Sequence, residues 1–192
     1  MLTGQRDYQR TYLRAPYFEP VLYVDNGFVF KASTLNISEG GMLLNQVPHF
    51  PEKNEIVSLM ISFRQYPYFK NFNLDRLRNY SDDVFPKIIV RVKSQMVRKI
   101  GMQSKLDEIF ESRIGLKFID VSHEAAQSIK DYVSVFLSNL IFLQVLIDSL
   151  NANESNLEKV RLLSEILGYD PKMKIALLHK TVQHDYRSLQ WL

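Results

Sequence analysis

The sequence contains no cysteine, little net charge and no uninterrupted apolar run long enough to cross a membrane. The absence of cysteine among 192 residues excludes disulfides, thiolate catalysis and zinc sites built from cysteine, and it is compatible with a reducing cytoplasm. The formal net charge of +3 does not by itself indicate a nucleic-acid-binding protein. Hydrophobic residues make up 46% and charged residues 23% of the chain, which is typical of soluble globular proteins. We therefore expect one sizeable core, or one domain with an appendage.

The amino-terminal residues 1–14 do not resemble a secretory signal, because they are polar and contain no apolar segment. The most apolar run of the chain covers residues 132–147. Polar residues interrupt it, and it is shorter than the roughly 20 residues that a membrane span needs. We therefore predict a buried helix at this place, no membrane span and a cytoplasmic location. The interrupting residues are Ser134, Ser138, Asn139 and Gln144.

Short runs rich in β-branched and aromatic residues predict a β-rich domain between Glu19 and Ser122. Turn signals separate the runs, and the strongest is Asp-Asn-Gly at 25–27, because Asn and Gly tolerate positive φ. Five or six short antiparallel strands of this kind indicate a small barrel, which also removes exposed sheet edges. The predicted strands cover residues 20–24, 28–33, 41–45, 55–63, 87–97 and 113–121.

Residues 64–86 interrupt the strand pattern and are expected to form an insertion. They are rich in aromatic residues and cations but have no strand period, and we expect one helical turn near Leu74 to Arg78. The insertion can form a lid packed over the barrel mouth. It can also form a surface for a partner, because exposed aromatic residues with arginine are typical of interfaces.

The hydrophobic period changes after Ser122, and this change predicts a long helix. Seven apolar residues then recur with alternating spacings of four and three, which is a heptad seam. A second apolar set lies off the seam, so the helix must be covered on two sides, by the barrel and by another helix of the same chain or of a second copy. The seam consists of Ile129, Val133, Phe136, Leu140, Leu143, Ile147 and Leu150, and the second set of Val135, Leu137, Phe142, Val145 and Leu146.

The end of the sequence contains signals for two further helices. A capping box begins at Ser155, and Gly168 follows as a stop signal. Asp170 and Pro171 then form the start signal of the next helix. We expect both helices to pack on the long helix of the same chain, and a homodimer through residues 125–150 is the alternative.

Two arginines near the start of the chain offer chemistry for an anionic purine ligand. Arg10 and Arg14 each carry a planar cationic group that can pair with phosphate or with the O6/N7 edge of guanine, and that can stack on a base. Two such groups on one segment can hold a compact ligand from opposite sides. The spacing alone is common by chance and predicts little.

A polar turn about twenty residues later offers complementary groups. Asn36 and Ser38 supply hydrogen-bond donors and acceptors for a base edge. Gly40 and Gly41 let backbone N–H groups approach a ligand without an intervening Cβ. The two arginines followed by this turn, before and within a small barrel, are more specific than either stretch alone.

The two stretches together resemble the PilZ domain family. The family pattern is R-x-x-x-R in an amino-terminal loop, followed by [D/N]-x-S-x-x-G after the second strand. The matching residues are Arg10, Arg14, Asn36, Ser38 and Gly41, and RIGLKFIDVSHEA, from residue 113 onward, also resembles the last strand and helix start of the family.

The resemblance covers about residues 6–137, so it leaves out the helical tail. It implies a mainly β fold with α, in which a six-stranded antiparallel PilZ-type barrel is followed by a long helix and a short helical tail. We expect the barrel domain to cover residues 1–122, with the insertion at 64–86, and the helical module to cover 123–192.

The resemblance also implies that the protein binds the bacterial second messenger cyclic di-GMP, without a cofactor and without catalysis, and relays it to a protein partner. Arg6 has the same spacing from Arg10 as Arg10 has from Arg14, which leaves a second register open. Many relatives carry an additional arginine at the position of Gln9, and the resemblance connects this position with ligand stoichiometry. The implied ligand-binding residues are Arg10, Arg14, Asn36, Ser38, Gly40 and Gly41, with Arg6 and Gln9 as further candidates.

Three other functions were compared with this one. A PilZ-like scaffold would bind a protein without ligand control. A nucleic-acid-binding barrel could use the basic residues between 86 and 105, although a solvated outer face explains them better. An enzyme or a metal protein is the weakest alternative, because the histidines are scattered. The histidines are His49, His123, His179 and His184.

Overall fold

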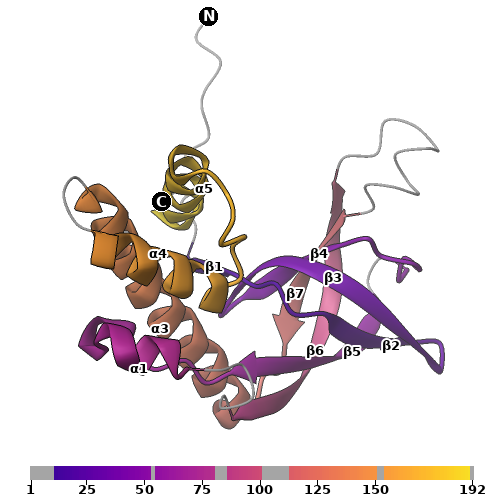
Figure 1. Cartoon of the computed structure of the whole chain (residues 1–192). Helices are drawn as coiled ribbons and strands as arrows, with labels where there is room; N and C mark the ends of the chain where they lie inside the picture. Colours follow the sequence, from indigo (N-terminus) through magenta and orange to yellow (C-terminus); the bar gives the residue numbers. More distant parts are fainter. Residues whose placement is uncertain (1–10, 53–54, 81–85, 101–112, 151–153, 191–192) are drawn as a thin grey trace, which may run out of the picture.

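The computed structural model describes residues 11–52, 55–80, 86–100, 113–150 and 154–190 (Figure 1). Within these residues there are seven strands, all antiparallel to their neighbours. They are β1 (Arg14–Pro16), β2 (Val21–Asp25), β3 (Phe28–Ser38), β4 (Gly41–Asn45), β5 (Ile56–Arg64), β6 (Lys87–Ile100) and β7 (Arg113–Ile119).

The strands form one sheet in the order β1-β3-β2-β5-β6-β7-β4, and an additional pairing of β3 with β4 closes it. Six strands therefore form the barrel, and β1 is an extra strand attached to β3. The predicted six-stranded barrel is confirmed, and its predicted strands correspond to β2 to β7. The extra strand was missed because three residues ending in proline show no strand period.

The turn between β2 and β3 has the predicted geometry. Asn26 and Gly27 have φ values of 48° and 79°, and Asp25 lies opposite Phe28 in the ladder. This two-residue turn needs positive φ at both positions, which explains the Asn-Gly pair.

Alternating apolar residues fill the barrel. Val57, Leu59, Ile61 and Phe63 of β5 are buried, as are Val21 and Tyr23 of β2. The intervening residues point outward, as the period of two requires.

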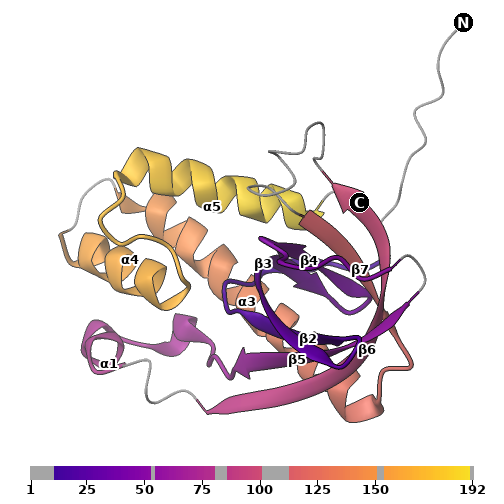
Figure 2. The same cartoon turned by 90° about the vertical axis from the view of Figure 1, so that its right-hand side faces the viewer.

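Helices cover one side of the barrel, as the view in Figure 2 shows. The long helix α3 begins directly after Ser122, whose side chain accepts a hydrogen bond from the backbone N–H of Ala125 at 3.2 Å. This cap explains why the helix starts where the sequence predicted it. The helices are η1 (Phe69–Asn71), α1 (Leu74–Arg78), α3 (His123–Asp148), α4 (Glu154–Ile166) and α5 (Ile175–Gln190).

The heptad seam of α3 is covered within the same chain. Phe136, Leu140 and Leu143 have no exposed surface, and α4 and α5 pack against the helix. Among the residues that the structure describes, α3 is also the one helix long and apolar enough to cross a membrane by length and composition. The core helix of a folded domain meets the same criterion of length and composition, and its apolar seam is buried as that of α3 is. A homodimer would have to use the opposite face, where Ile141 and Val145 are exposed.

The described part of the predicted insertion, residues 64–80, packs on the helices through η1 and α1. The predicted helical turn near Leu74 to Arg78 is confirmed as α1, which lies against α4, while η1 lies against α3. Phe69, Phe72 and Leu77 are buried in these contacts. Of the aromatic side chains that suggested an interface, Phe69 and Phe72 therefore belong to the core, Tyr66 and Tyr80 pack against it partly buried, and Tyr68 is exposed.

Candidate functional site

The extra strand β1 brings the first of the predicted ligand residues to the polar turn. In its ladder with β3, Arg14 lies opposite Ser38, and Pro16 lies opposite Asn36. Residues that are directly opposite in an antiparallel ladder point to the same face of the sheet. Arg14, Asn36 and Ser38 therefore belong to one face, and this short ladder aligns the two halves of the motif.

A β-bulge decides which face this is. The inward-facing residues of β3 are first Ala32 and Thr34, but beyond the bulge the inward-facing residue is Ile37. The register of β3 against β4 shifts between Thr34 and Asn36, which leaves Leu35 as the extra residue. One extra residue reverses the alternation of the strand. Without the bulge Asn36 would point into the barrel, and with it the polar side chain points outward.

The glycines of the turn are both explained by close neighbours. A Cβ on Gly41 would lie 2.1 Å from the backbone oxygen of Leu116 in β7, so no side chain fits there. The carbonyl of Gly40 accepts a hydrogen bond from the backbone N–H of Phe118 at 3.0 Å, and the hydroxyl of Ser38 donates to the carbonyl of Gly41 at 3.1 Å. These contacts fix the turn onto β7 and use the hydroxyl proton of Ser38 for the turn itself.

An aromatic ring that the sequence analysis did not single out lies over this turn. A Cβ added to Gly40 would come within 2.7 Å of the ring of Tyr12, and this ring remains 47% exposed. Tyr12 stands between the two arginines of the motif, and its position there was the signal available in the sequence. An exposed ring beside Arg14 and the glycine turn can stack on a base.

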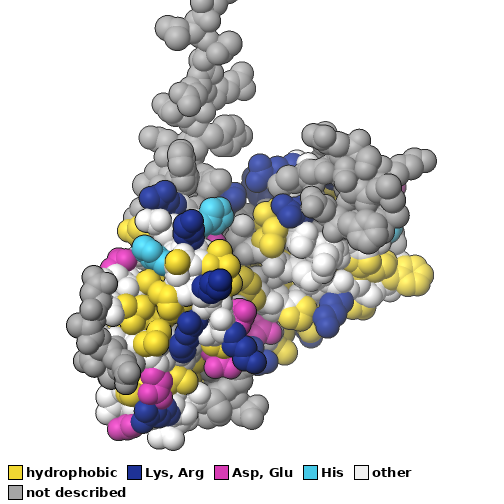
Figure 3. All heavy atoms as spheres, turned by 45° about the horizontal axis from the view of Figure 1, so that its top comes forward, with side chains coloured by type: hydrophobic (Ala, Val, Ile, Leu, Met, Phe, Trp, Pro, Cys, Tyr) yellow, Lys and Arg dark blue, Asp and Glu magenta, His cyan; other side chains and the backbone are white. Residues whose placement is uncertain are grey.

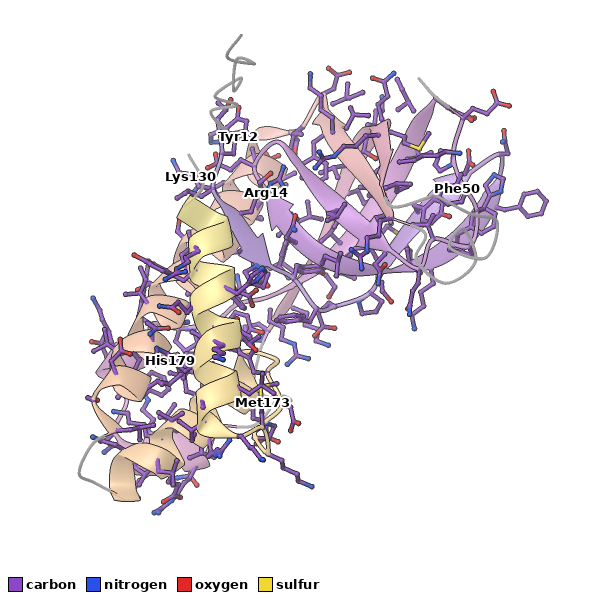
Figure 4. All side chains as sticks on the ribbon, turned by 90° about the horizontal axis from the view of Figure 1, so that it is seen from above. Tyr12, Arg14, Phe50, Lys130, Met173 and His179 are labelled. Atoms are coloured by element: carbon purple, nitrogen blue, oxygen red, sulfur yellow. The ribbon has the colours of Figure 1, made fainter. Side chains whose placement is uncertain are left out.

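Two helices border the same face. The phenol of Tyr132 in α3 donates a hydrogen bond to the carbonyl of Pro16 at 3.0 Å. Burial raises the pKa of Tyr132 well above its ordinary value, so the phenol remains a donor at alkaline pH as well as at neutral pH. Helix α5 also contacts β1, and in Figure 4 Tyr12, Arg14 and Lys130 lie where this helix approaches the strand. The candidate site is therefore a face of β1 and β3 with helices along one border.

The structure brings together Arg14, Asn36, Ser38, Gly40 and Gly41 of the predicted ligand-binding residues, and their binding of a ligand stays a prediction. Arg14 is the first residue of a strand, whereas the family pattern implied a loop. The other predicted residues, Arg6, Gln9 and Arg10, lie outside the described residues.

A cavity of about 360 Å³ lies elsewhere, between the barrel and helices α3 and α4. Tyr17, Tyr66 and Tyr132 line it, together with a pair in which the Nε of Arg64 donates to Glu19 at 2.6 Å. None of the predicted ligand residues lines this cavity. Within the described parts of the chain, no group of three or more His, Asp or Glu side chains is arranged to hold a metal ion.

Comparison with known families decides what this arrangement of strands and motif represents. The family described as the PilZ domain matches residues 5–134, which is more than half of the chain. The chain belongs to the PilZ domain family. The match ends within α3, so α4 and α5 are additions to the PilZ domain.

Several solved structures are similar to this PilZ protein at low sequence identity. The inhibitor of motility MotI/DgrA of Bacillus subtilis has 14% identity and a TM-score of 0.46, and the match covers 66% of this chain and 50% of that one. The PilZ domain of YcgR from Escherichia coli, described with c-di-GMP, has 12% identity and a TM-score of 0.43, with 67% and 91% covered. The MrkH–c-di-GMP complex of K. pneumonia has 14% identity and a TM-score of 0.38, with 73% and 54% covered.

The chain spans about half the length of the MotI and MrkH chains that it matches. No curated protein matches it.

Proposed function

We propose that this PilZ protein is a receptor for cyclic di-GMP, that it binds the nucleotide on the outer face of β1 and β3, and that it relays the signal to a protein partner. The observation that carries the proposal is the β1–β3 ladder, in which Arg14 is opposite Ser38 beside the glycine turn. Membership of the PilZ family and the complete R-x-x-x-R and N-x-S-x-x-G patterns support the same ligand.

Each residue of the motif has a role that follows from its chemistry. Arg10 and Arg14 pair with the phosphates and the guanine O6/N7 edges of the nucleotide, because their guanidinium groups match both. Asn36 points outward and contacts a base edge. The backbone around Gly40 approaches the ligand closely, and Tyr12 stacks on a guanine.

The proposed role is that of a cytoplasmic binding protein and not of an enzyme. The ligand carries the signal, and the protein responds by changing its contacts. The resemblance to the PilZ family supports this assignment, because the family has no catalytic role. The division into a barrel domain over 1–122 and a helical module over 123–192 gives the response two parts.

The proposed relay uses the segment that carries Arg10 and the helices that border the site. A ligand that binds both Arg10 and the turn at 36–41 must hold the amino-terminal segment against β3. Helix α5 contacts β1, so that segment and the end of α5 meet at the same strand. The nucleotide can drive this change only through its higher affinity for one of the two states.

Calorimetric titration with cyclic di-GMP tests the binding. We expect the parent protein to bind and Arg14→Ala and Arg10→Ala to lose most of the affinity, whereas Lys174→Ala, an exposed cation before α5, should bind like the parent. Ligand at about 100 times its dissociation constant should add roughly 2.7 kcal/mol to the free energy of unfolding.

The outcomes separate the alternatives. A parent protein that does not bind the nucleotide supports the ligand-independent scaffold. Loss of binding in Arg6→Ala but not in Arg14→Ala assigns the motif to the other register. Hydrogen exchange of residues 4–16 with and without ligand tests the relay, and equal protection at saturation contradicts it.

A further inference from the structure

A second outward face of the barrel combines exposed aliphatic and cationic side chains. It is formed by four neighbouring strands, in the order β3-β2-β5-β6. Val24 lies opposite Val29, Leu22 lies opposite Met60, and Met60 in turn lies opposite Arg91, so these side chains share the outer face. We name it the apolar–basic face, and it consists of Leu22, Val24, Val29, Lys31, Met60, Ile89, Arg91 and Lys93, with Ser58 and Ser62 between them.

The aliphatic side chains of this face are open to solvent. Val29 of β3 is 64% exposed, and Ile89 of β6 is 63% exposed. Leu22 and Val24 lie on β2, between these two strands, and are 38% and 36% exposed. In the space-filling view, hydrophobic side chains gather at the right-hand end of the molecule, where the β2–β3 hairpin lies in Figure 1, with Lys or Arg side chains nearby (Figure 3). Contiguous exposed aliphatic residues with polar neighbours are characteristic of interaction surfaces.

The charge on this face has a single sign. The four strands contain one acidic residue, Asp25, and its side chain is buried with 3% exposed surface. Lys31, Arg91 and Lys93 are exposed. The field above the face is therefore positive and favours an acidic partner.

The topology limits how a partner can bind. At the centre of the face, Leu22–Val24 of β2 and Ser58–Met60 of β5 each pair with a neighbour on both sides, so this centre offers no free edge to which a partner strand could add. A partner that covers the centre therefore lies across it and fills it with side chains.

The chemistry favours a protein over a nucleic acid. Barrels that hold single strands stack successive bases on aromatic side chains, and the residues of the apolar–basic face are aliphatic residues, cations and two serines, with no aromatic ring among them. Aliphatic side chains contribute through burial against other apolar side chains, which a sugar-phosphate backbone lacks.

We propose that the apolar–basic face binds an amphipathic helix of a partner protein, with aliphatic residues along its centre and acidic residues along its rims. Leu22, Val24, Val29 and Met60 contact the apolar stripe, and Lys31, Arg91 and Lys93 pair with the carboxylates. The proposal goes beyond nucleotide binding and does not depend on it, because none of these residues belongs to the ligand motif.

Fluorescence anisotropy with defined probes tests the proposal in the full chain without cyclic di-GMP. The probes are a fluorescein-labelled amphipathic helical peptide of Leu and Glu, the same peptide with Lys in place of Glu, a labelled single-stranded DNA, and vesicles of phosphatidylglycerol and phosphatidylcholine. We expect the acidic peptide to bind preferentially, and more weakly as salt rises.

Variants locate the binding on the face. The double variant Arg91→Glu/Lys93→Glu should weaken binding of the acidic peptide by at least about tenfold. The double variant Leu22→Ser/Val29→Ser should weaken it as well, whereas Lys174→Glu, outside the face, should leave it unchanged. Circular dichroism should show that all variants fold.

The results that overturn the proposal are equally defined. They are the absence of binding to the acidic peptide, the same affinity in the Arg91→Glu/Lys93→Glu variant as in the parent, or tighter binding to DNA or to vesicles. Failure of cyclic di-GMP to bind in the calorimetric titration would reject the receptor function and leave this result unaffected.

Discussion

The side chain of Asn139 in α3 holds the backbone of Phe69 in the insertion. Its oxygen accepts a hydrogen bond from the N–H of Phe69 at 2.9 Å, and its nitrogen donates to the carbonyl of Pro67 at 2.8 Å. Asn139 is 1% exposed and lies among the apolar residues of the helix. One buried amide therefore satisfies two backbone groups of a segment some seventy residues away.

Replacing Asn139 by Ala should destabilise the protein by about 2–4 kcal/mol, because it leaves a buried N–H and a buried carbonyl without partners. Unfolding in urea, followed by circular dichroism, measures this loss. The exposed neighbour Ser134→Ala is the control and should change stability by less than about 0.5 kcal/mol. A loss below about 1 kcal/mol for Asn139→Ala would show that water replaces the amide.

The two glycines of the candidate site should respond differently to substitution by alanine. In Gly41→Ala the new methyl group meets the backbone of β7, which cannot move without breaking the ladder, and we expect a loss of about 1–3 kcal/mol. In Gly40→Ala it meets the ring of Tyr12, which can swing away. Thermal unfolding of both variants should therefore show a lower Tm for Gly41→Ala than for Gly40→Ala. Equal melting temperatures would contradict this reading of the turn.

The strands of the barrel could be predicted because they are short runs rich in β-branched and aromatic residues, and because turn signals such as Asp-Asn-Gly at 25–27 separate them. The extra strand β1 could not be predicted, because its stability comes from pairing with β3 and from cover by the helices. The long helix and its seam were predictable from spacing. The partner of Asn139 was not, because that contact joins residues far apart in the sequence.

The composition of the candidate site was predictable, but its orientation was not. The motif identified the residues, and the bulge at Leu35 decides that Asn36 points outward. No glycine or proline marks this bulge, so a simple alternation counted from Ala32 assigns Asn36 to the inside. Tyr12 was missed because its position between the two arginines was the single signal for it, and the family pattern leaves that position unspecified.

Buried tyrosines should make the protein sensitive to alkaline pH. Burial raises the pKa values of Tyr17, Tyr132 and Tyr169 above their ordinary value, and Asp185 beside Tyr169 raises its pKa further. Above about pH 10 the unfolded chain releases these protons and the folded chain keeps them, so the unfolded state binds fewer protons. The free energy of unfolding should therefore be at its full value below about pH 10 and fall above it.

Denaturant unfolding at a series of alkaline pH values measures this slope. Tyr169→Phe removes one of the three groups and should make the decline less steep, although it also loses the hydrogen bond to Asp185. A free energy of unfolding that stays constant from about pH 9 to about pH 11 would contradict the prediction.

Removing the helices that cover α3 should change the solution behaviour of the protein. A chain that ends at residue 150 lacks Val160, Leu163, Leu178 and Val182, all of which are fully buried in the full chain. The uncovered apolar side chains of α3 should make the truncated protein aggregate or self-associate, which light scattering after gel filtration detects. A soluble truncated monomer would be the contrary result, and it would mean that the seam does not need its cover.

The closing strand of the barrel is also its last strand in the chain. Because β7 pairs with both β6 and β4, the barrel cannot close until residues 113–119 have left the ribosome. Helix α3 follows at once, while Val182, which helps to cover it, is still to be synthesised. We therefore expect each nascent chain to pass through a stage in which the barrel can close while the apolar helix still lacks its cover, and such exposed apolar surface is prone to aggregation. The expected consequence is that the helices added to this PilZ domain lengthen the time for which α3 is exposed during synthesis.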